Sequence, residues 1–564
     1  MRDEMVELTG SKALLEALKA EHVKYIFGIP GGAIIPVYDA LYDEHEIHHI
    51  LTRHEQGATH AADGYARALG KPGVCLTTSG PGATNLTTGV LNAYMDSSPV
   101  IAISGQMPTP MLGSDAFQEA DMLSLMLPVT KHNFIVHKIG ELPAVVRLAF
   151  KIATTGRPGP VHIDLPKNVQ VDKADLKIPA DIKYEKKLKF DPSAEDVRKA
   201  VDMLVNAEQP VIYAGGGVIW SGASAELVEL AELLGAPVTT SLLGKGTIPE
   251  DHPLSLGMLG MHGRMAANLV VTESDVLLGV GVRFSDRATG DVRHFAPKAK
   301  IIHIDIDPVE IGKIVRVDLP IVGDARRSLA AIIKGLRVQV KRGRTSEWLR
   351  RIKKLREELA PRMDYDEIPI KPQRAIKEIM GVLDDDAIVV TEVGQCQMWA
   401  AHFCQIKKPR HFISSGGLGT MGFGFPASMG AKVACPKCDV VNIAGDGSFL
   451  MNSQELATVV VNKINVVSCI FNNGYLGMVK QWQDMFFQKR RSAVNLGKSP
   501  DFVKLAEAYG AWGDRAVRPG EIAPKLREAL RSGKPAVLDI PIDPDEHALP
   551  MVPTGGRLDE PILT

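Results

Sequence analysis

The chain has 564 residues, and its 65 lysine and arginine residues almost balance its 66 aspartate and glutamate residues, for a net charge of -1. This balance argues against nucleic acid or an anionic membrane surface as a partner. No apolar run approaches the roughly 18 residues that a membrane-spanning helix needs, and the length predicts about three or four domains.

The first ten residues, MRDEMVELTG, are acidic and lack the apolar core of a signal peptide, so we expect a cytoplasmic chain. The six cysteines are too few for a disulfide framework in a chain of this length. CPKC, from Cys435 to Cys438, has the spacing of half a zinc site, but a structural zinc needs four ligands and no second pair exists. We interpret it as a surface loop with two thiols.

Short apolar, β-branched runs alternate with helical patterns along the chain. Continuous apolar strands indicate burial on both faces, and strand–helix alternation predicts parallel sheets covered by helices. The fold class is therefore α/β, with three doubly wound parallel-sheet domains. In chain order, the runs singled out as strands are VKYIFGI (23–29), PVIAISG (99–105), GPVHIDLP (159–166), PVIYAGGG (210–217), DVLLGVGV (275–282), KIIHIDI (300–306), AIVVTEVG (387–394), DVVNIAGDG (439–447) and INVVSCIFNN (464–473).

Two stretches interrupt this alternation. Residues 171–196 are charged, contain prolines and show no period, and residues 341–372 read as a basic-acidic helix followed by an extended segment. Both are interpreted as connections between domains. The expected domains are residues 1–185, 190–345 and 370–564.

The stretch TRHEQGATHAADGYARALG (52–70) contains His54, Glu55 and His60. A zinc-binding HExxH motif would need its second histidine at position 58, which is Ala58, whereas His60 lies about 240° further round a helix. The alanines and Gly57 instead predict a closely packed helix. The residues adjacent to Glu55 in the sequence do not by themselves indicate a function for it.

Residues 439–479 read as strand, glycine turn, helix and strand. If the two strands are parallel neighbours, Asp446 and Asn473 converge at the sheet edge where α/β proteins bind ligands. Such oxygen ligands suit Mg²⁺ shared with a phosphate group, and Gly445 and Gly447 allow the backbone to approach it. A plain β-α-β unit with turn glycines is the alternative.

Two local patterns near this segment are interpreted from spacing. Asn452 and Glu455 have the spacing of a capping box at a helix start. GGLGTMG (416–422) contains a formal GxGxxG, but it follows no clear strand and has no ribose-binding acid after it, so it fails as a dinucleotide fingerprint. It suits a backbone segment that approaches a cofactor closely.

The GDG turn followed by NN resembles the signature of thiamine-diphosphate enzymes. Over nearly the whole chain, the sequence is similar to catalytic (large) subunits of the acetohydroxyacid synthase family, also called acetolactate synthases. The matching stretches are FGIPGGAIIPVYDAL, RHEQGATHAADGYARA, TTSGPGATN, DAFQEAD, GRPGPVHIDLPK, MLGMHG, GVRFSDRATG, GLGTMGFG and LGMVKQWQ.

The resemblance implies that the chain decarboxylates pyruvate and joins the two-carbon unit to a second 2-ketoacid. Pyruvate would give 2-acetolactate, and 2-ketobutyrate would give 2-aceto-2-hydroxybutyrate, in the first common step of branched-chain amino-acid synthesis. The implied cofactors are thiamine diphosphate, Mg²⁺ and FAD, the last without a net redox step. A homodimer or homotetramer with active sites between subunits is implied, and a small regulatory subunit is frequent in the family.

The resemblance also assigns residues. Asp446, Asn473 and the backbone carbonyl of Tyr475 would bind Mg²⁺. Glu55 would act on the aminopyrimidine ring, and Met421 would hold the cofactor bent. The other implied thiamine-diphosphate contacts are Gln395, Gly419, Gly445, Gly447, Ser448, Gly477 and Met478.

Gly32, Phe117, Gln118 and Lys167 match family positions near bound intermediates or in the substrate pocket. A surface role is the alternative for Lys167. Trp482 matches the tryptophan that favours the larger second ketoacid, with ordinary aromatic packing as its alternative. One methylene is worth only about 1–3 kcal/mol in an apolar pocket, so the preference would be partial.

A flavin site is expected in the middle domain. Gly215, Gly216 and Gly217 follow a strand and precede a helix, where backbone amides can bind a diphosphate. Ser285 departs from the family's usual acid, which puts one polar contact in doubt. The remaining implied FAD contacts are Met261, His262, Gly263, Gly281, Arg283, Arg287, Asp305 and Asp324.

Other thiamine-diphosphate enzymes are the alternative reading, among them pyruvate oxidase, pyruvate decarboxylase, glyoxylate carboligase and catabolic acetolactate synthase. Glyoxylate carboligase lacks the activating glutamate, pyruvate oxidase lacks the QWQ element, and the catabolic enzymes lack the pairing of MHG with RFSDR. A non-catalytic flavin-binding scaffold is a third reading. The intact set of Glu55, Asp446 and Asn473 argues against it.

Overall fold

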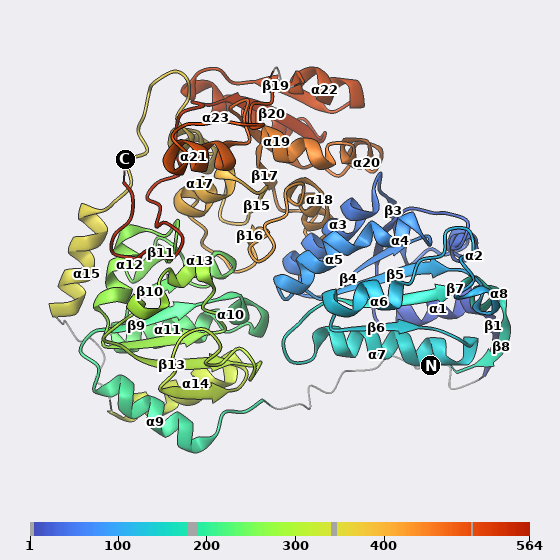
Figure 1. The fold of residues 1–564 in the computed structure, drawn as a ribbon, viewed down its shortest axis with the longest axis horizontal. Helices are drawn as coiled ribbons and strands as arrows, with labels where there is room; N and C mark the ends of the chain where they lie inside the picture. The colour runs from blue at the N-terminus through green and yellow to red at the C-terminus, as the bar shows by residue number, and fades with distance from the viewer. Residues whose placement is uncertain (1–4, 178–189, 340–346, 498–499, 564) are drawn as a thin grey trace.

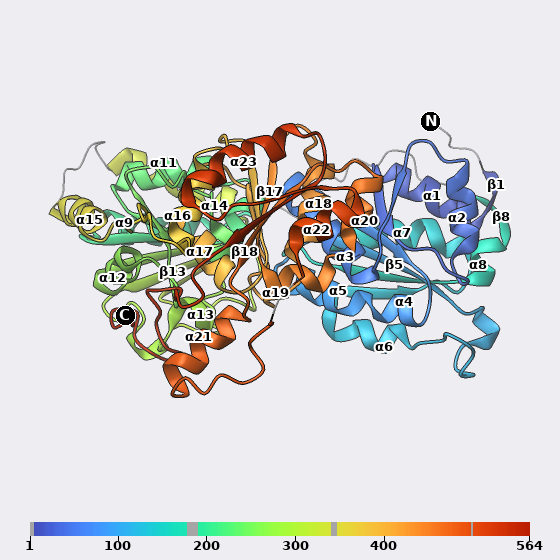
Figure 2. The same ribbon diagram turned by 90° about the horizontal axis from the view of Figure 1, so that it is seen from above.

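The computed structural model describes residues 5–177, 190–339, 347–497 and 500–563. These residues form three α/β domains, each around a six-stranded sheet whose strand pairs are all parallel (Figure 1). Seen from above, helices cover the sheets of all three domains (Figure 2). All nine expected strands form, so the predicted fold class is confirmed.

The N-terminal domain has the sheet order β3-β2-β4-β5-β7-β6. Its strands β4, β5 and β7 are buried along their whole length, as their continuous apolar sequences predict. Its elements are β1 (Val6–Thr9), α1 (Gly10–Ala20), β2 (Tyr25–Gly28), α2 (Ile35–Tyr42), β3 (His48–Leu51), α3 (Glu55–Leu69), β4 (Gly73–Thr77), α4 (Pro81–Thr84), α5 (Leu86–Met95), β5 (Val100–Gln106), α6 (Met122–Met126), β6 (His132–Ile135), α7 (Leu142–Thr154), β7 (Val161–Pro166), α8 (Lys167–Val171) and β8 (Lys173–Leu176).

The middle domain has the order β11-β10-β9-β12-β13-β14, so the strand order reverses between β9 and β12. Ligands bind at such reversals in open α/β sheets. Its elements are α9 (Ala194–Val205), β9 (Pro210–Ala214), α10 (Gly216–Ser221), α11 (Ser224–Leu234), β10 (Val238–Thr240), β11 (Ser255–Met258), α12 (Met265–Glu273), β12 (Val276–Val280), α13 (Asp286–Thr289), β13 (Lys300–Asp305), β14 (Leu319–Val322), α14 (Ala325–Gln339) and α15 (Glu347–Glu358).

The C-terminal domain has the order β16-β15-β17-β18-β20-β19, and its strand order reverses between β15 and β17. After β20 the chain returns to the middle domain, where Val552 N donates to Met261 O at 2.7 Å. Its elements are α16 (Pro372–Met380), β15 (Ile388–Thr391), α17 (Gln395–Phe403), β16 (Phe412–Ile413), α18 (Gly424–Ala434), β17 (Val440–Gly445), α19 (Asp446–Phe449), α20 (Glu455–Val461), β18 (Val467–Asn472), α21 (Gly477–Phe486), α22 (Phe502–Tyr509), β19 (Trp512–Arg515), α23 (Pro519–Arg531) and β20 (Ala536–Pro541).

The two expected connections contain more structure than their sequences suggested. Within residues 171–196, β8 pairs antiparallel with β1, residues 178–189 lie outside the described chain, and α9 begins at Ala194. The predicted basic-acidic helix forms as α15, and the indole N–H of its Trp348 donates to Pro210 O of the middle domain at 3.2 Å. This helix therefore packs on the middle domain as well as leading out of it.

The capping box predicted for Asn452 and Glu455 is wrong. Glu455 begins α20, but its carboxylate accepts hydrogen bonds from the backbone N–H groups of Arg53 and His54, at 3.0 Å from each to Oε1. Asn452 donates to Gly422 O at 2.7 Å. The spacing was correct for a local cap, but the nearby start of α3, a positive helix end, binds the carboxylate instead.

Small residues join α3 to α18, and both helices are almost wholly buried along this contact. A Cβ at Gly64 would lie 2.1 Å from Ala427 O, and one at Gly430 would lie 1.8 Å from Ala61 O. The expectation of a closely packed alanine helix in residues 52–70 is thus confirmed. The thiols of the CPKC loop, at the end of α18, are partly buried against the core rather than fully on the surface.

We expect Gly64→Ala to destabilise the protein by about 1–3 kcal/mol, because the added methyl forces α3 away from α18. Gly520→Ala is the matched control: a Cβ at this position in α23 meets nothing within 4 Å, so the change should be neutral or stabilising. Thermal denaturation followed by circular dichroism measures both. Equal midpoints for the two variants would contradict the packing argument.

No helix in the described ranges is long and apolar enough to cross a membrane.

Candidate active site

Glu55 is the first residue of α3, which follows β3 at the carboxyl edge of the N-terminal sheet. Its Oε2 accepts a hydrogen bond from Asn85 Nδ2 at 2.9 Å. A Cβ at Gly82 would lie 3.3 Å from its Oε1, so the glycine leaves room beside the carboxylate. The helix start and Asn85 together fix the orientation of this acid.

The other N-terminal candidates follow strands at the same edge. Gln118 has a φ of 61°, and its backbone O lies 2.8 Å from where a Cβ of Gly80 would be. A Cβ at Gly32 would meet nothing within 4 Å. The side chain of Phe117, which precedes Gln118 in the sequence, is 86% exposed. Lys167 begins α8 directly after β7. The structure thus places all the N-terminal candidates around one edge.

In the C-terminal domain, β17 and β18 are parallel neighbours, with Gly445 opposite Phe471, as the magnesium hypothesis required. Asp446, only 1% exposed, accepts a hydrogen bond from Gly474 N at 2.9 Å, next to Asn473. Asn473 Oδ1 accepts from Tyr475 N at 3.0 Å. A carboxylate and a side-chain amide oxygen lie near each other here, and with the carbonyl of Tyr475 they would form a ligand set suited to Mg²⁺.

No group of three or more histidine, cysteine or acidic side chains in the described residues could hold a metal ion. The ligand set above differs from such a group because it has a single carboxylate.

Close backbone approaches surround these ligands. A Cβ at Gly477 would lie 2.1 Å from Gln395 Oε1, and Gln395 in turn accepts a hydrogen bond from Asn473 Nδ2 at 3.2 Å. A Cβ at Gly447 would lie 4.0 Å from Met421 Cε. Ser448 donates to Gly445 O at 3.2 Å. The predicted thiamine-diphosphate contacts of this domain therefore share one region.

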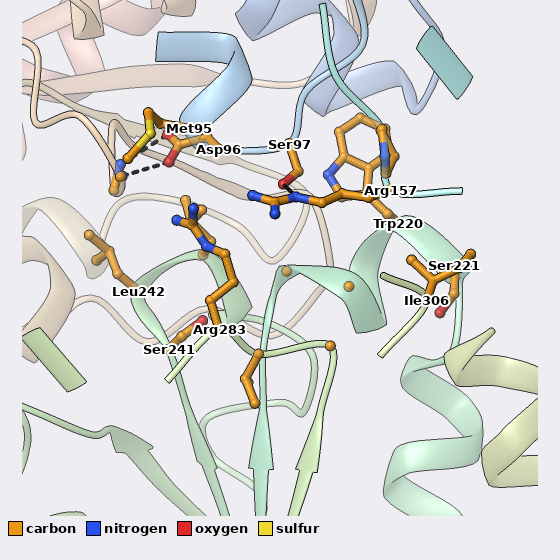
Figure 3. A pocket seen from close by; sticks show the side chains of 18 of the residues that line it. Met95, Asp96, Ser97, Arg157, Trp220, Ser221, Ser241, Leu242, Arg283 and Ile306 are labelled. Carbon is orange, nitrogen blue, oxygen red and sulfur yellow. Dashed lines mark hydrogen bonds between the residues drawn. The ribbon is translucent and has the colours of Figure 1, made fainter. Parts of the chain in front are cut away.

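A cavity of about 1480 Å³ lies between the three domains, and it is larger than the usual pocket for a small ligand. It reaches from the strand reversal of the middle domain to Gly419, Met478 and Trp482 of the C-terminal domain. Figure 3 shows Asp96, Arg157, Trp220 and Arg283 around it. The predicted FAD residues that line it are Gly216, Gly217, Met261, His262, Gly281, Arg283, Arg287, Asp305 and Asp324.

The cavity presents polar groups that the surrounding described residues leave without partners. Arg283 forms no hydrogen bond or ion pair within the described ranges, and Nδ1 of the buried His262 has no well-aligned hydrogen bond there, although the ring lies near backbone groups of Ala548 and Pro550. Burial lowers the pKa of His262 to about 4, so the ring is neutral at pH 7. Burial also raises the pKa of Asp305 to about 6. These groups suit a large ligand with an anionic part and hydrogen-bonding edges.

The middle-domain glycines have a role that differs from the prediction. Gly215 N donates to Val280 O at 3.0 Å and Gly217 N donates to Gly281 O at 3.2 Å, so these two amides are already used within the fold. A Cβ at Gly215 would lie 2.1 Å from Gly281 O. Close packing of two turns explains Gly215 and Gly217, and only Gly216 and Gly217 reach the cavity wall. Gly263 packs on Gly260 N outside the lining.

Trp482 lines the large cavity from the C-terminal domain. Its ring lies 6.0 Å from the Arg287 guanidinium and 5.9 Å from the Phe486 ring, so its packing interpretation also has support. Ser285, where the sequence departs from the family pattern, is an exposed residue of the lining. Arg287 Nη1 contacts Met261 Sδ at 3.4 Å.

Sequence reasoning missed several cavity residues. Arg157 donates to Ser97 Oγ at 2.8 Å and to Glu310 Oε1 at 2.7 Å, which ties the N-terminal domain to the middle domain. Trp220 lies 4.8 Å from the guanidinium of Arg410. Both had a sequence signal: Arg157 lies in the matching stretch GRPGPVHIDLPK, and Trp220 closely follows the glycine run at 215–217.

The comparisons with known proteins identify each domain. Residues 8–125 match the N-terminal TPP-binding domain of thiamine pyrophosphate enzymes, residues 197–332 their central domain, and residues 392–540 their C-terminal TPP-binding domain. A probable acetolactate synthase large subunit of Methanocaldococcus jannaschii is 58% identical, over 98% of this chain and 94% of that protein. The chain belongs to the acetolactate synthase large-subunit family.

Two bacterial relatives extend the match over almost their full lengths. The acetolactate synthase large subunit of Haemophilus influenzae is 44% identical over 99% of both chains. The isozyme 3 large subunit of Escherichia coli is 44% identical over 99% of this chain and 98% of its own. The chain is therefore a thiamine-pyrophosphate-dependent enzyme of the acetolactate synthase type, as the sequence motifs predicted.

Proposed function

We propose that the chain catalyses the decarboxylation of pyruvate and the condensation of the two-carbon unit with a second pyruvate or with 2-ketobutyrate. The products would be 2-acetolactate and 2-aceto-2-hydroxybutyrate, in branched-chain amino-acid synthesis. The near full-length similarity to acetolactate synthase large subunits carries this proposal. The retention of Glu55, Asp446 and Asn473 supports it, because a non-catalytic descendant would have no need for all three.

Thiamine diphosphate, when bound, supplies the thiazolium carbon that carries the two-carbon unit. Glu55 would hold or accept a proton at the aminopyrimidine ring, with one carboxylate oxygen already fixed by Asn85 Nδ2. Gln118, Gly32, Phe117 and Lys167 would line the substrate side of the same edge. Trp482 would select the second ketoacid, with an effect limited to the value of one methylene.

Mg²⁺ would be held by Asp446 Oδ, the side-chain oxygen of Asn473 and the carbonyl of Tyr475. A single carboxylate with two neutral oxygens leaves room for the diphosphate oxygens that Mg²⁺ prefers as further ligands. Gly445 and Gly447 would let the backbone of the strand end approach the diphosphate, and a Cβ at Gly447 would lie only 2.9 Å from Leu476 Cδ2, so a larger residue does not fit there.

We also assign FAD to the large cavity. Its volume of about 1480 Å³, the guanidinium of Arg283 and Nδ1 of His262 fit a dinucleotide with a diphosphate bridge. Gly216 and Gly217 lie in the lining at the strand reversal, where such ligands bind. The flavin would have a structural role, since the proposed reaction involves no net oxidation or reduction.

Arg283→Leu should therefore weaken FAD retention by about tenfold or more, because a charge-assisted hydrogen bond is lost from a partly buried site. Arg316→Leu is the matched control: Arg316 is 90% exposed in the same domain and lies outside the lining. Flavin absorbance after gel filtration measures retention. Full flavin content in Arg283→Leu would contradict the assignment.

A second copy of this chain is the proposed partner. Neither Glu55 nor Asp446 lines the large cavity, and exposed apolar side chains lie next to the candidate residues of each domain. Leu123, Leu125 and Leu127 follow the Gln118 segment, and Leu127 is 70% exposed. Met451, 54% exposed, lies close to Asp446 in sequence. A homodimer, or a homotetramer made of such dimers, would cover these side chains and complete each site.

The relatives are named large subunits, and a small regulatory subunit is proposed as a further partner on that ground. We propose a cytoplasmic location, with neither nucleic acid nor membrane as partner. The six cysteines, which are all free thiols, agree with a reducing compartment.

One assay tests the proposed reaction. The purified chain is incubated with thiamine diphosphate, Mg²⁺, FAD and pyruvate, with and without 2-ketobutyrate, and the products are identified. Acetolactate, and aceto-hydroxybutyrate when both ketoacids are present, is the expected result. Acetaldehyde, or acetyl phosphate with peroxide, would instead indicate a pyruvate decarboxylase or oxidase.

A further inference from the structure

A buried ion cluster joins the N-terminal domain to the segment 414–420. Arg67 donates from Nε to Asp63 Oδ1 at 2.7 Å and from Nη2 to Asp96 Oδ2 at 2.9 Å. The side chains of both aspartates are fully buried, and that of Arg67 is 10% exposed. Asn92, also buried, donates to Asp63 Oδ2 at 2.9 Å. Asp63 and Arg67 lie in α3, Asn92 lies in α5 and Asp96 directly follows α5, so the cluster links these two helices.

Three of these side chains, Arg67, Asn92 and Asp96, bind segment 414–420, and Asp63 holds Arg67 and Asn92 in place. Asp96 accepts from Gly416 N at 3.0 Å and from Gly417 N at 2.6 Å, and both bonds are drawn at the left of Figure 3. Arg67 Nη1 donates to Ser414 O at 2.7 Å. Asn92 Oδ1 accepts from the hydroxyls of Ser415, at 2.5 Å, and Thr420, at 3.0 Å.

Within the C-terminal domain, Gln397 donates to Ser414 Oγ at 2.7 Å and to Ser415 O at 2.8 Å, so the first two residues of the segment are also held there. Three of its seven residues are glycines, and Gly419 has a φ of +70°. A Cβ at Gly417 would lie 2.8 Å from Asp96 Oδ1, so the backbone sits directly on the carboxylate. Hydrogen bonds to the cluster therefore anchor the glycine-rich part of the segment, from Gly416 to Thr420.

Two proposed cofactor contacts depend on that course. Residues 415–419 line the large cavity, and Met421 follows two residues after Gly419. Beyond Met421, Gly422 N donates to the buried Glu392 at 2.9 Å and Gly422 O accepts from Asn452 at 2.7 Å. Met421 thus lies between two anchored points, one held by Asp96 and Asn92 and the other by Glu392.

We propose that Asp63, Arg67, Asn92 and Asp96 are positioning residues that fix segment 414–420, and through it Gly419 and Met421, against thiamine diphosphate. Buried ion clusters contribute little net stability once desolvation is counted, but they define a single geometry. This inference rests on the proposed function, because it gives the cluster its effect through the cofactor.

Asp96→Asn tests the inference. The asparagine amide has one hydrogen-bond-accepting oxygen instead of the two of the carboxylate, and it lacks the negative charge that pairs with Arg67. We expect hydrogen–deuterium exchange in residues 414–422 of the cofactor-free chain to become about tenfold faster or more. In the holoenzyme, the thiamine diphosphate concentration for half-maximal rate should rise by at least about tenfold.

Two further comparisons separate positioning from general stability. Glu250→Gln is the matched control, because Glu250 forms a similar buried pair with Lys245 at 2.6 Å, lies outside the lining of the large cavity and forms no hydrogen bond to segment 414–420 within the described residues. It should leave both measurements near wild type. Thr420→Val removes only one hydroxyl from the network. It should change the exchange rate and the thiamine diphosphate requirement in the same direction as Asp96→Asn, but by less. Thr420→Ser, which keeps the hydroxyl, should give wild-type values.

Unchanged exchange in Asp96→Asn would overturn the inference, and so would faster exchange with an unchanged requirement for thiamine diphosphate. A Glu250→Gln effect as large as that of Asp96→Asn would overturn it too, since the response would then be general. A wild-type chain that makes no acetolactate would refute the proposed function instead. The exchange measurement on the cofactor-free chain would still decide whether the cluster holds the segment.

Discussion

Glu55→Gln should lower the rate of acetolactate formation by about 10²–10⁴-fold while the protein remains folded. Glutamine has the shape of glutamate and can still accept the hydrogen bond from Asn85, so α3 should begin at the same residue. It cannot hold or release a proton at this position. The loss should therefore appear in the chemical step, as slower exchange of the thiazolium C2 proton, with thiamine diphosphate still bound.

Glu46→Gln is the control for this change, because Glu46 is a 65% exposed acid of the same domain that lies in no candidate site. Its rate should match wild type. A Glu55→Gln enzyme with wild-type exchange of the C2 proton would remove Glu55 from the mechanism, whatever its overall rate.

Sequence patterns identified those parts of the fold that depend on local periodicity. All nine runs singled out as strands form, because a continuous apolar run of this length is stable only between two helical layers. The pairing of β17 with β18 followed from their order along the chain, and it brings Asp446 beside the segment of Asn473 as expected. The short β1–β8 pair was missed because β8 lies in a charged stretch without an apolar period.

Long-range partners were not accessible to such reasoning. Glu455 has the spacing of a local cap, yet its carboxylate binds Arg53 and His54, some 400 residues earlier in the chain. Gly215 looked like a phosphate-binding glycine, whereas the turn after β12 requires its small size. In both cases the residue type was informative about chemistry, and the partner depended on how two domains or two turns meet.

The cavity shows the same limit at a larger scale. Family motifs indicated most of its middle-domain lining, and Arg157 lies in the matching stretch GRPGPVHIDLPK, but Asp96 of the N-terminal domain lies outside any recognised motif. A side chain that acts at a domain boundary carries no periodic or spacing signal. Its role becomes visible only when its hydrogen bonds to a distant segment are known.

Asp446→Ala should abolish Mg²⁺-dependent activity at ordinary metal concentrations, because it removes the only carboxylate of the proposed ligand set. We expect the Mg²⁺ concentration for half-maximal rate to rise by at least about 100-fold. Asp439→Ala, at the opposite end of the same strand, is the matched control and should keep wild-type metal dependence. A normal Mg²⁺ requirement in Asp446→Ala would refute the assigned ligand set.

Mixing the two inactive variants tests where the active site is assembled. If Glu55 of one chain serves a cofactor held by Asp446 of the other, each Glu55→Gln/Asp446→Ala heterodimer contains one intact site and one doubly damaged site. Random pairing of equal amounts then restores about a quarter of wild-type activity. If both residues served a site within one chain, every site would carry a lesion and no activity would return. The result therefore distinguishes a shared site from a site within one subunit, independently of any measurement of oligomeric size.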